Sequence, residues 1–83
     1  MDREQIIKEV ENILEEIGEC GVRLSDGDVL EIVPSENFIG GIEGHYASEN
    51  LGNVAYSNAR DVVEELLNFV KSIGLTVKEV EYL

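Results

Sequence analysis

Two segments of this chain carry apolar residues at the spacing of a single helix face. In residues 2–17 the stripe consists of Ile6, Val10, Ile13 and Ile17, widened by Ile7 and Leu14. In residues 59–73 it consists of Val62, Leu66, Phe69, Val70 and Ile73, flanked by Val63 and Leu67. Recurrence every three or four residues places side chains on one side of a helix. The sequence therefore predicts two amphipathic helices, each with one face to bury.

Residues at the ends of both segments support these boundaries. Asp2 precedes the first helix, and either Ser57 or Asn58 precedes the second. The side chains of such residues accept hydrogen bonds from the free amides of the first turn. Gly18 and Gly74 follow the helices, and glycine readily adopts the left-handed conformation that ends a helix.

Between the helices, alternating residues around a Ser-Asp-Gly-Asp turn predict a β-hairpin. Val22 and Leu24 precede the turn, and Leu30 and Ile32 follow it. A two-residue loop would place apolar side chains opposite charged ones, whereas an odd loop keeps the apolar side chains on one face. We therefore expect a three-residue loop at residues 26–28, or a five-residue loop, that pairs Leu24 with Leu30 and Val22 with Ile32.

The same register pairs Arg23 with Glu31 as opposite charges on the other face. Pro34 is expected to end the second strand, because proline has no amide hydrogen to donate to a neighbouring strand. A third strand is predicted over residues 38–46, although three glycines weaken it and suggest a bulge. Residues 48–53 are expected to form a loop, and residues 54–56 a further short extended segment.

The last strand is predicted over residues 75–83, with a break in its alternation. Leu75 and Val77 share one phase, whereas Val80 and Tyr82 share the other. Such a change of phase predicts a bulge near Lys78 and Glu79, or a strand that changes faces.

The predicted order of elements is α-β-β-(β)-α-β, in one domain over residues 1–83. Strands joined by short loops pair antiparallel, and each helix has one apolar stripe. The expected fold is therefore of the α+β class, with two helices packed on one face of a small antiparallel sheet.

Composition narrows the possible partners. The 83 residues include eighteen acidic and six basic ones, giving a net charge of -12. Proteins that bind nucleic acids through phosphates cluster Lys and Arg, whereas the six basic residues here are scattered. We therefore expect no binding to nucleic acid or to an anionic membrane surface, whereas a basic protein or a metal ion is compatible with the charge.

The cysteine count and the first residues indicate the compartment. Cys20 is the only cysteine, so no intrachain disulfide can form, and small secreted domains usually contain several. The chain lacks the apolar run of a signal peptide or a membrane span. A cytoplasmic location is expected. In its acidity and its Glu, Ile and Val content, the chain resembles small acidic orphan proteins of archaeal genomes, a likeness of composition that implies no functional residues.

The hairpin tip is one candidate site. Asp26 and Asp28, with Glu31 nearby, place carboxylates around the turn, and calcium and magnesium prefer oxygen ligands. The twelve-residue calcium loop of EF-hands is absent, and Asp and Gly are also common turn formers. Any binding of calcium or magnesium here is expected to be weak, and no other cofactor is expected.

The Gly-rich segment is the other candidate site. His45, the only histidine, lies between Glu43 and Tyr46 with Asn50 shortly after, and a histidine beside a carboxylate can act as a base or a ligand. No nucleophile motif accompanies it, so a surface or half-buried strand histidine is the simpler interpretation.

Three functional hypotheses follow, in this order. The first is a non-enzymatic protein-interaction or binding module that contacts a basic protein or associates with itself through an exposed strand edge, such as the C-terminal strand. The second is weak divalent-cation binding at the hairpin tip. The third is small-molecule binding or catalysis around His45, which ranks last because no complete catalytic constellation is present.

Overall fold

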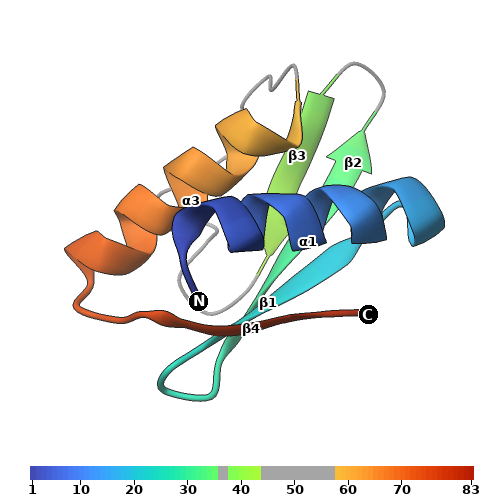
Figure 1. The fold of residues 1–83 in the computed structure, drawn as a ribbon. Helices are drawn as coiled ribbons and strands as arrows, with labels where there is room; N and C mark the ends of the chain where they lie inside the picture. Colours follow the sequence, from blue (N-terminus) through green and yellow to red (C-terminus); the bar gives the residue numbers. More distant parts are fainter. Residues whose placement is uncertain (36–37, 44–57) are drawn as a thin grey trace.

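A computed structural model describes residues 1–35, 38–43 and 58–83 (Figure 1). The elements in chain order are α1 (Arg3–Ile17), β1 (Cys20–Leu24), β2 (Val29–Ser35), β3 (Phe38–Glu43), α3 (Ala59–Ser72) and β4 (Val77–Glu81). The strands form one sheet in the order β3-β2-β1-β4, with every neighbouring pair antiparallel. Both helices pack on the same face of this sheet (Figure 1). The predicted α+β architecture is confirmed.

The predicted helix ends are also confirmed. Asp2 Oδ1 accepts a hydrogen bond from the Gln5 amide at 2.8 Å, and the Asn58 side chain accepts one from the Asp61 amide at 3.0 Å. Of the two residues proposed to cap the second helix, Asn58 is the cap. Gly18 follows α1 with a φ of 79°, which is the left-handed conformation expected of a helix stop.

The hairpin has the predicted odd loop, but its register is shifted by two residues. Val22 pairs with Leu30, and Cys20 pairs with Ile32. The predicted pairs of Leu24 with Leu30 and of Val22 with Ile32 are therefore wrong. Because the shift is even, the apolar side chains still share one face.

The position of the glycine in the turn explains this register. The loop consists of residues 25–27: the Leu24 amide donates to the Asp28 carbonyl at 2.8 Å, and the Gly27 amide donates to the Leu24 carbonyl at 3.0 Å. Gly27 has a φ of 93°. A three-residue hairpin loop needs a positive φ at its last residue, and glycine adopts it without strain. A loop at residues 26–28 would instead require that conformation of Asp28.

Two further strand predictions need correction. Arg23 lies opposite Val29 rather than Glu31. Pro34 does not end β2, which continues to Ser35; the β2–β3 register shifts between Ile32 and Pro34. A proline fits such an irregularity, because no regular ladder hydrogen bond is required from it. β3 covers residues 38–43 of the predicted third strand, and the predictions for residues 44–46, 48–53 and 54–56 fall outside the described residues.

The predicted bulge in the last strand is confirmed. Arg23 of β1 pairs with Glu79, but the next residue, Leu24, pairs with Val77. Lys78 is therefore the extra residue of the bulge. The bulge lets both Val77 and Val80 pack against the core despite their odd separation in sequence.

The core lies between the sheet and the helices and is mainly aliphatic, although it includes Phe69. The largest side chains with no exposed surface are Leu24, Leu30, Ile32, Leu66, Val10, Val22, Val62, Val63 and Cys20. None of the described charged residues is buried. Alternation along β1 directs Val22 and Leu24 toward the helices and Arg23 toward the opposite face of the sheet.

Candidate functional site

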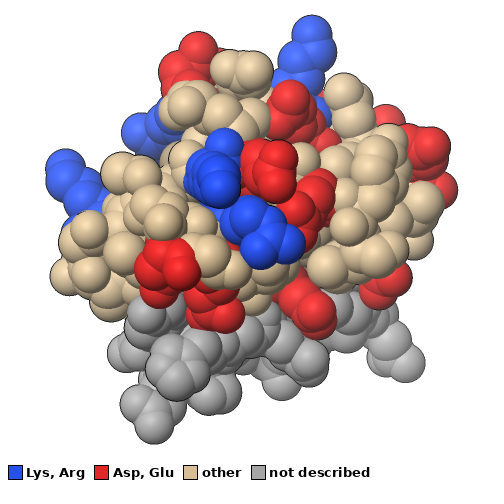
Figure 2. Space-filling model, turned by 90° about the horizontal axis from the view of Figure 1, so that it is seen from below, with Lys and Arg blue, Asp and Glu red and all other residues tan. Residues whose placement is uncertain are grey.

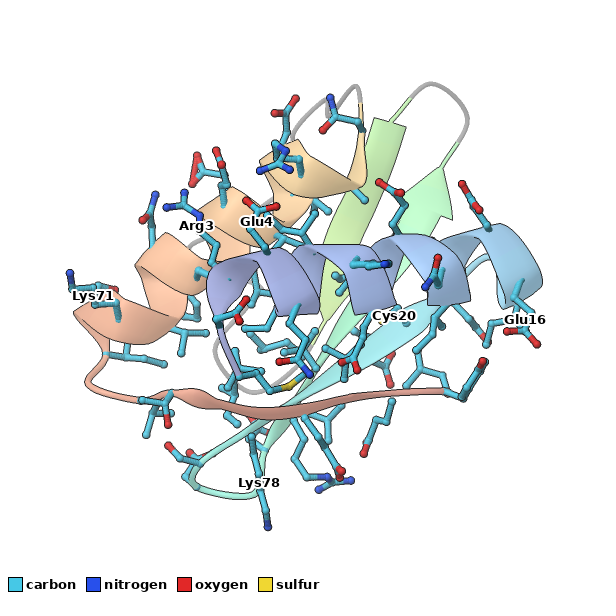
Figure 3. The ribbon with its side chains drawn as sticks, viewed as in Figure 1. Arg3, Glu4, Glu16, Cys20, Lys71 and Lys78 are labelled. Carbon is cyan, nitrogen blue, oxygen red and sulfur yellow. The ribbon has the colours of Figure 1, made fainter. Side chains whose placement is uncertain are left out.

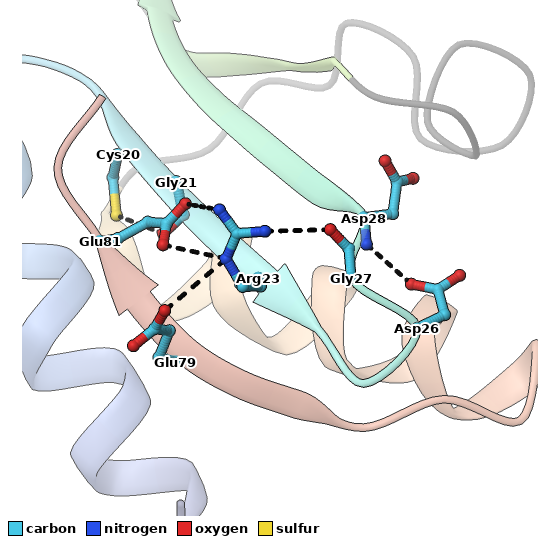
Figure 4. Close-up of polar contacts among 8 residues, drawn as sticks. All are labelled: Cys20, Gly21, Arg23, Asp26, Gly27, Asp28, Glu79 and Glu81. Carbon is cyan, nitrogen blue, oxygen red and sulfur yellow. Dashed lines mark hydrogen bonds and ion pairs between the residues drawn. The ribbon is translucent and has the colours of Figure 1, made fainter.

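The structure places two of the three predicted cation ligands, Asp26 and Asp28, side by side at the turn, without Glu31. Asp26 Oδ1 accepts a hydrogen bond from the Asp28 amide at 2.9 Å, as a turn-forming aspartate does (Figure 4). Strand alternation places Asp28 on the same side as Leu30, toward the helices, and Glu31 on the opposite side. Asp28 Oδ2 is buried, and no hydrogen-bond partner for it lies among the described residues. The same residues contain no group of three or more His, Cys, Asp or Glu side chains suited to a metal ion.

The second predicted site lies largely outside the described part of the chain. This applies to His45, Tyr46 and Asn50. Glu43 is the last residue of β3, and its backbone pairs with that of Glu31. Ligand binding around His45 therefore stays a prediction.

Arg23 is the centre of a polar cluster on the face of the sheet opposite the helices (Figure 4). Its guanidinium donates to both carboxylate oxygens of Glu81, at 3.2 and 2.8 Å, and to the Gly27 carbonyl at 3.0 Å. Glu79 lies 3.6 Å away. The hydrogen bonds to Glu81 raise the pKa of Arg23. The cluster connects the hairpin turn to β4, so it has a structural role. The positive charge of Arg23 is already neutralised by the carboxylates around it.

Cys20 is buried in β1 with no exposed surface. Burial, followed by the charges of Glu81 and Glu9, raises the pKa of its thiol from 9.0 to about 12. The nucleophilic form of cysteine is the thiolate. Cys20 is therefore a core side chain and not a reactive nucleophile.

The burial of Cys20 should protect its thiol from alkylation. We expect iodoacetamide to leave Cys20 unmodified in the folded protein near neutral pH and to label it on unfolding in urea. Because the pKa is higher in the folded state, the thiol's contribution to stability is fully present below pH 9.0 and is lost as the pH rises toward about 12. The free energy of unfolding, measured by urea titration, should fall over that range. Cys20→Ala should lack this part of the decrease, and labelling of the folded protein as fast as the unfolded one would contradict the assignment.

An apolar groove lies where three elements meet. It is bounded by the first turns of α1, the last turns of α3 and the start of β4, and has a volume of about 470 Å³. Its floor is formed by the apolar residues Ile6, Leu67, Val70, Leu75 and Val77. We call this feature the α1–α3 groove.

Local backbone geometry forms one wall of the groove. After α3, Gly74 has a φ of 77°, and the Leu75 amide donates to the Val70 carbonyl at 3.1 Å. This reversal returns Leu75 to the side of α3. Thr76 then bonds to the hairpin turn: its amide donates to Ser25 Oγ at 3.1 Å, and its carbonyl accepts from the Ser25 amide at 2.9 Å.

Ion pairs between α1 and α3 fix the positions of these two helices, which form the other walls of the groove. Arg60 of α3 donates to both carboxylate oxygens of Glu4 of α1, at 2.8 and 3.0 Å. The hydrogen bonds from Arg60 lower the pKa of Glu4. Arg3 Nη2 lies 3.2 Å from Glu64 Oε1, which adds a second link between the helices.

Two cations border the groove. Arg3 of α1 and Lys71 of α3 both line it, and Figure 3 shows them on neighbouring helix ends. None of the described residues forms an ion pair with Lys71. No histidine, cysteine or carboxylate is among the described lining residues. This combination suits binding of an apolar group and lacks the side chains of general acid–base catalysis.

Comparison with known proteins finds no relative of this chain. The chain matches no protein-family model, no curated protein and no solved structure. Neither helix in the described part of the chain has the length and apolar character that crossing a membrane requires.

Proposed function

We propose that this protein is a non-enzymatic binding module and that the α1–α3 groove is its ligand site. The observation that carries the proposal is the apolar floor of this groove, on which Leu67, Leu75 and Val77 are only partly buried, whereas Ile6 and Val70 belong to the closed core. Its volume of about 470 Å³ is within the range of roughly 300–1,000 Å³ typical of small-molecule sites.

Interaction through the edge of β4 ranks second. β4 is an edge strand of the sheet, and unpaired edge strands can pair with another chain. However, Lys78 forms a bulge in this strand, and both Lys78 and Glu79 are exposed. Bulges and charged residues are features that keep an edge from pairing. The view from the β4 side shows basic and acidic side chains close together on this face (Figure 2), so the charge is less uniform than a strongly basic partner requires.

Cation binding at the hairpin tip ranks third. Asp26 already bonds to the Asp28 amide, and alternation directs Asp28 and Glu31 to opposite sides of the sheet. A cation would therefore meet few carboxylates at once.

Binding of a neutral apolar probe tests the proposed site. We expect decanol, added to isotope-labelled protein below its solubility limit, to shift the amide resonances of groove residues such as Ile6, Val70 and Leu75. Leu67→Gln should weaken this binding by about tenfold, because it removes apolar contact area worth on the order of 1.5 kcal/mol.

A matched variant distinguishes binding in the groove from nonspecific binding to exposed apolar residues. Ile17 is an apolar residue of the same helix layer, is 43% exposed and is absent from the groove lining. Ile17→Gln should leave decanol binding unchanged. Shifts spread over the whole surface, or equal effects of the two variants, would rule out the groove as the ligand site.

A further inference from the structure

We infer that the ligand of the groove is an anionic amphiphile, namely a free acyl carboxylate of medium chain length. Its tail would lie on the apolar floor, and its carboxylate would lie between Arg3 and Lys71. This inference rests on the proposed function, and it adds the chemical class of the ligand.

The distribution of positive charge supports an anionic headgroup. The chain has only six basic residues, and two of them, from different helices, border the same groove. Lys71 has no ion-pair partner among the described residues. Arg3 contacts Glu64 through Nη2, and no described residue accepts a hydrogen bond from its Nε or Nη1. Arginine and lysine donors form charge-assisted hydrogen bonds with carboxylates.

Carboxylates close to Arg3 in sequence or structure already have partners. Asp2 accepts a hydrogen bond from the Gln5 amide. Glu4 is bonded by both terminal nitrogens of Arg60, and Glu64 is paired with Arg3. Because these three carboxylates are engaged, they compete less for the cations at the rim than free carboxylates would.

The overall charge favours a small ligand over an acidic macromolecule. With a net charge of -12, the protein repels an acidic peptide or an anionic membrane over the rest of its surface. Screening limits such effects to about 10 Å at moderate salt. The electrostatic energy of a single carboxylate in the groove is therefore determined mainly by Arg3 and Lys71. A volume of about 470 Å³ is enough for one short acyl chain.

Decanoate and decanol form a matched pair of probes that differ in the headgroup. We expect decanoate to bind about five- to tenfold more tightly than decanol at neutral pH, corresponding to roughly 1 kcal/mol for a partly exposed ion pair. Affinities would be measured by calorimetry or amide shifts, below the concentration at which either probe aggregates. Lys71→Gln should remove most of the preference for decanoate, because it should lower the affinity for decanoate far more than the affinity for decanol.

Lys78→Gln is the control, because it changes the net charge equally at an exposed residue outside the groove lining. It should change neither affinity. Equal binding of the two probes, or a preference that persists in Lys71→Gln, would overturn the inference and leave the proposed function intact. Failure of both probes to bind would overturn both. Binding to an acidic amphipathic peptide or anionic vesicles, but not to free decanoate, would also overturn the inference.

Discussion

Leu66→Ala is expected to lower the free energy of unfolding by about 2–5 kcal/mol, the range typical of truncating a buried leucine in a packed core. Leu66 has no exposed surface and belongs to the cluster that joins α3 to the sheet. The loss includes both the transfer free energy of the missing carbons and the cavity that they leave. Small domains have a total stability of roughly 5–15 kcal/mol, so this single substitution removes a large part of it.

Leu67→Ala is the matched control for this prediction. Leu67 is the next residue of the same helix and is only partly buried, while both substitutions have the same effect on helix propensity. Urea unfolding followed by circular dichroism would compare the variants, and each 1 kcal/mol should lower Tm by about 4–8 °C in a domain of this size. Equal losses at the two positions would show that the core face of α3 is wrongly assigned.

The helices were predictable because local rules and packing agree there. The predicted apolar stripe of α1 contains all four of its buried residues, although its last member, Ile17, is exposed, and Asp2 and Gly18 mark the two ends of the helix. The bulge at Lys78 was also readable from the sequence, because one extra residue in a strand brings both phases of its alternation onto the same face.

The hairpin register shows what a hydrophobic pattern leaves open. Alternation fixes only which residues share a face, so two registers that differ by two residues satisfy it equally. The glycine decides between them, because the last residue of a three-residue loop needs a positive φ. Cys20 shares a face with Val22 and Leu24 in either register, and the observed register places it opposite Ile32.

The groove was not predictable, because it depends on how the helices are placed against each other. In the sequence, Leu67 is only a residue beside the apolar stripe of a helix, and Leu75 is only the first residue of a predicted strand. Arg3 and Lys71 read as isolated basic residues at helix ends. Only the packing of the first turns of α1 beside the last turns of α3 brings these residues to one site. No local pattern specifies that placement.

Gly27→Val is the second substitution with a large expected effect, and it tests the register directly. A Cβ at Gly27 would meet no atom within 4 Å, so the substitution causes no steric clash with neighbouring groups. The expected loss of about 1–2 kcal/mol comes from the left-handed backbone conformation, which is strained for L-residues. β-Branched residues are the least tolerant of a positive φ.

Gly27→Asn is the control, because asparagine tolerates this conformation better than other residues with a side chain. It should retain more stability than Gly27→Val in urea unfolding. In a loop at residues 26–28, Gly27 would be the middle residue with a negative φ, and valine would cause little strain there. Equal stability of the two variants would therefore contradict the observed register. Cross-strand nuclear Overhauser effects between Val22 and Leu30 in the unmodified protein would support it independently, because these residues pair only in the register with the loop at residues 25–27.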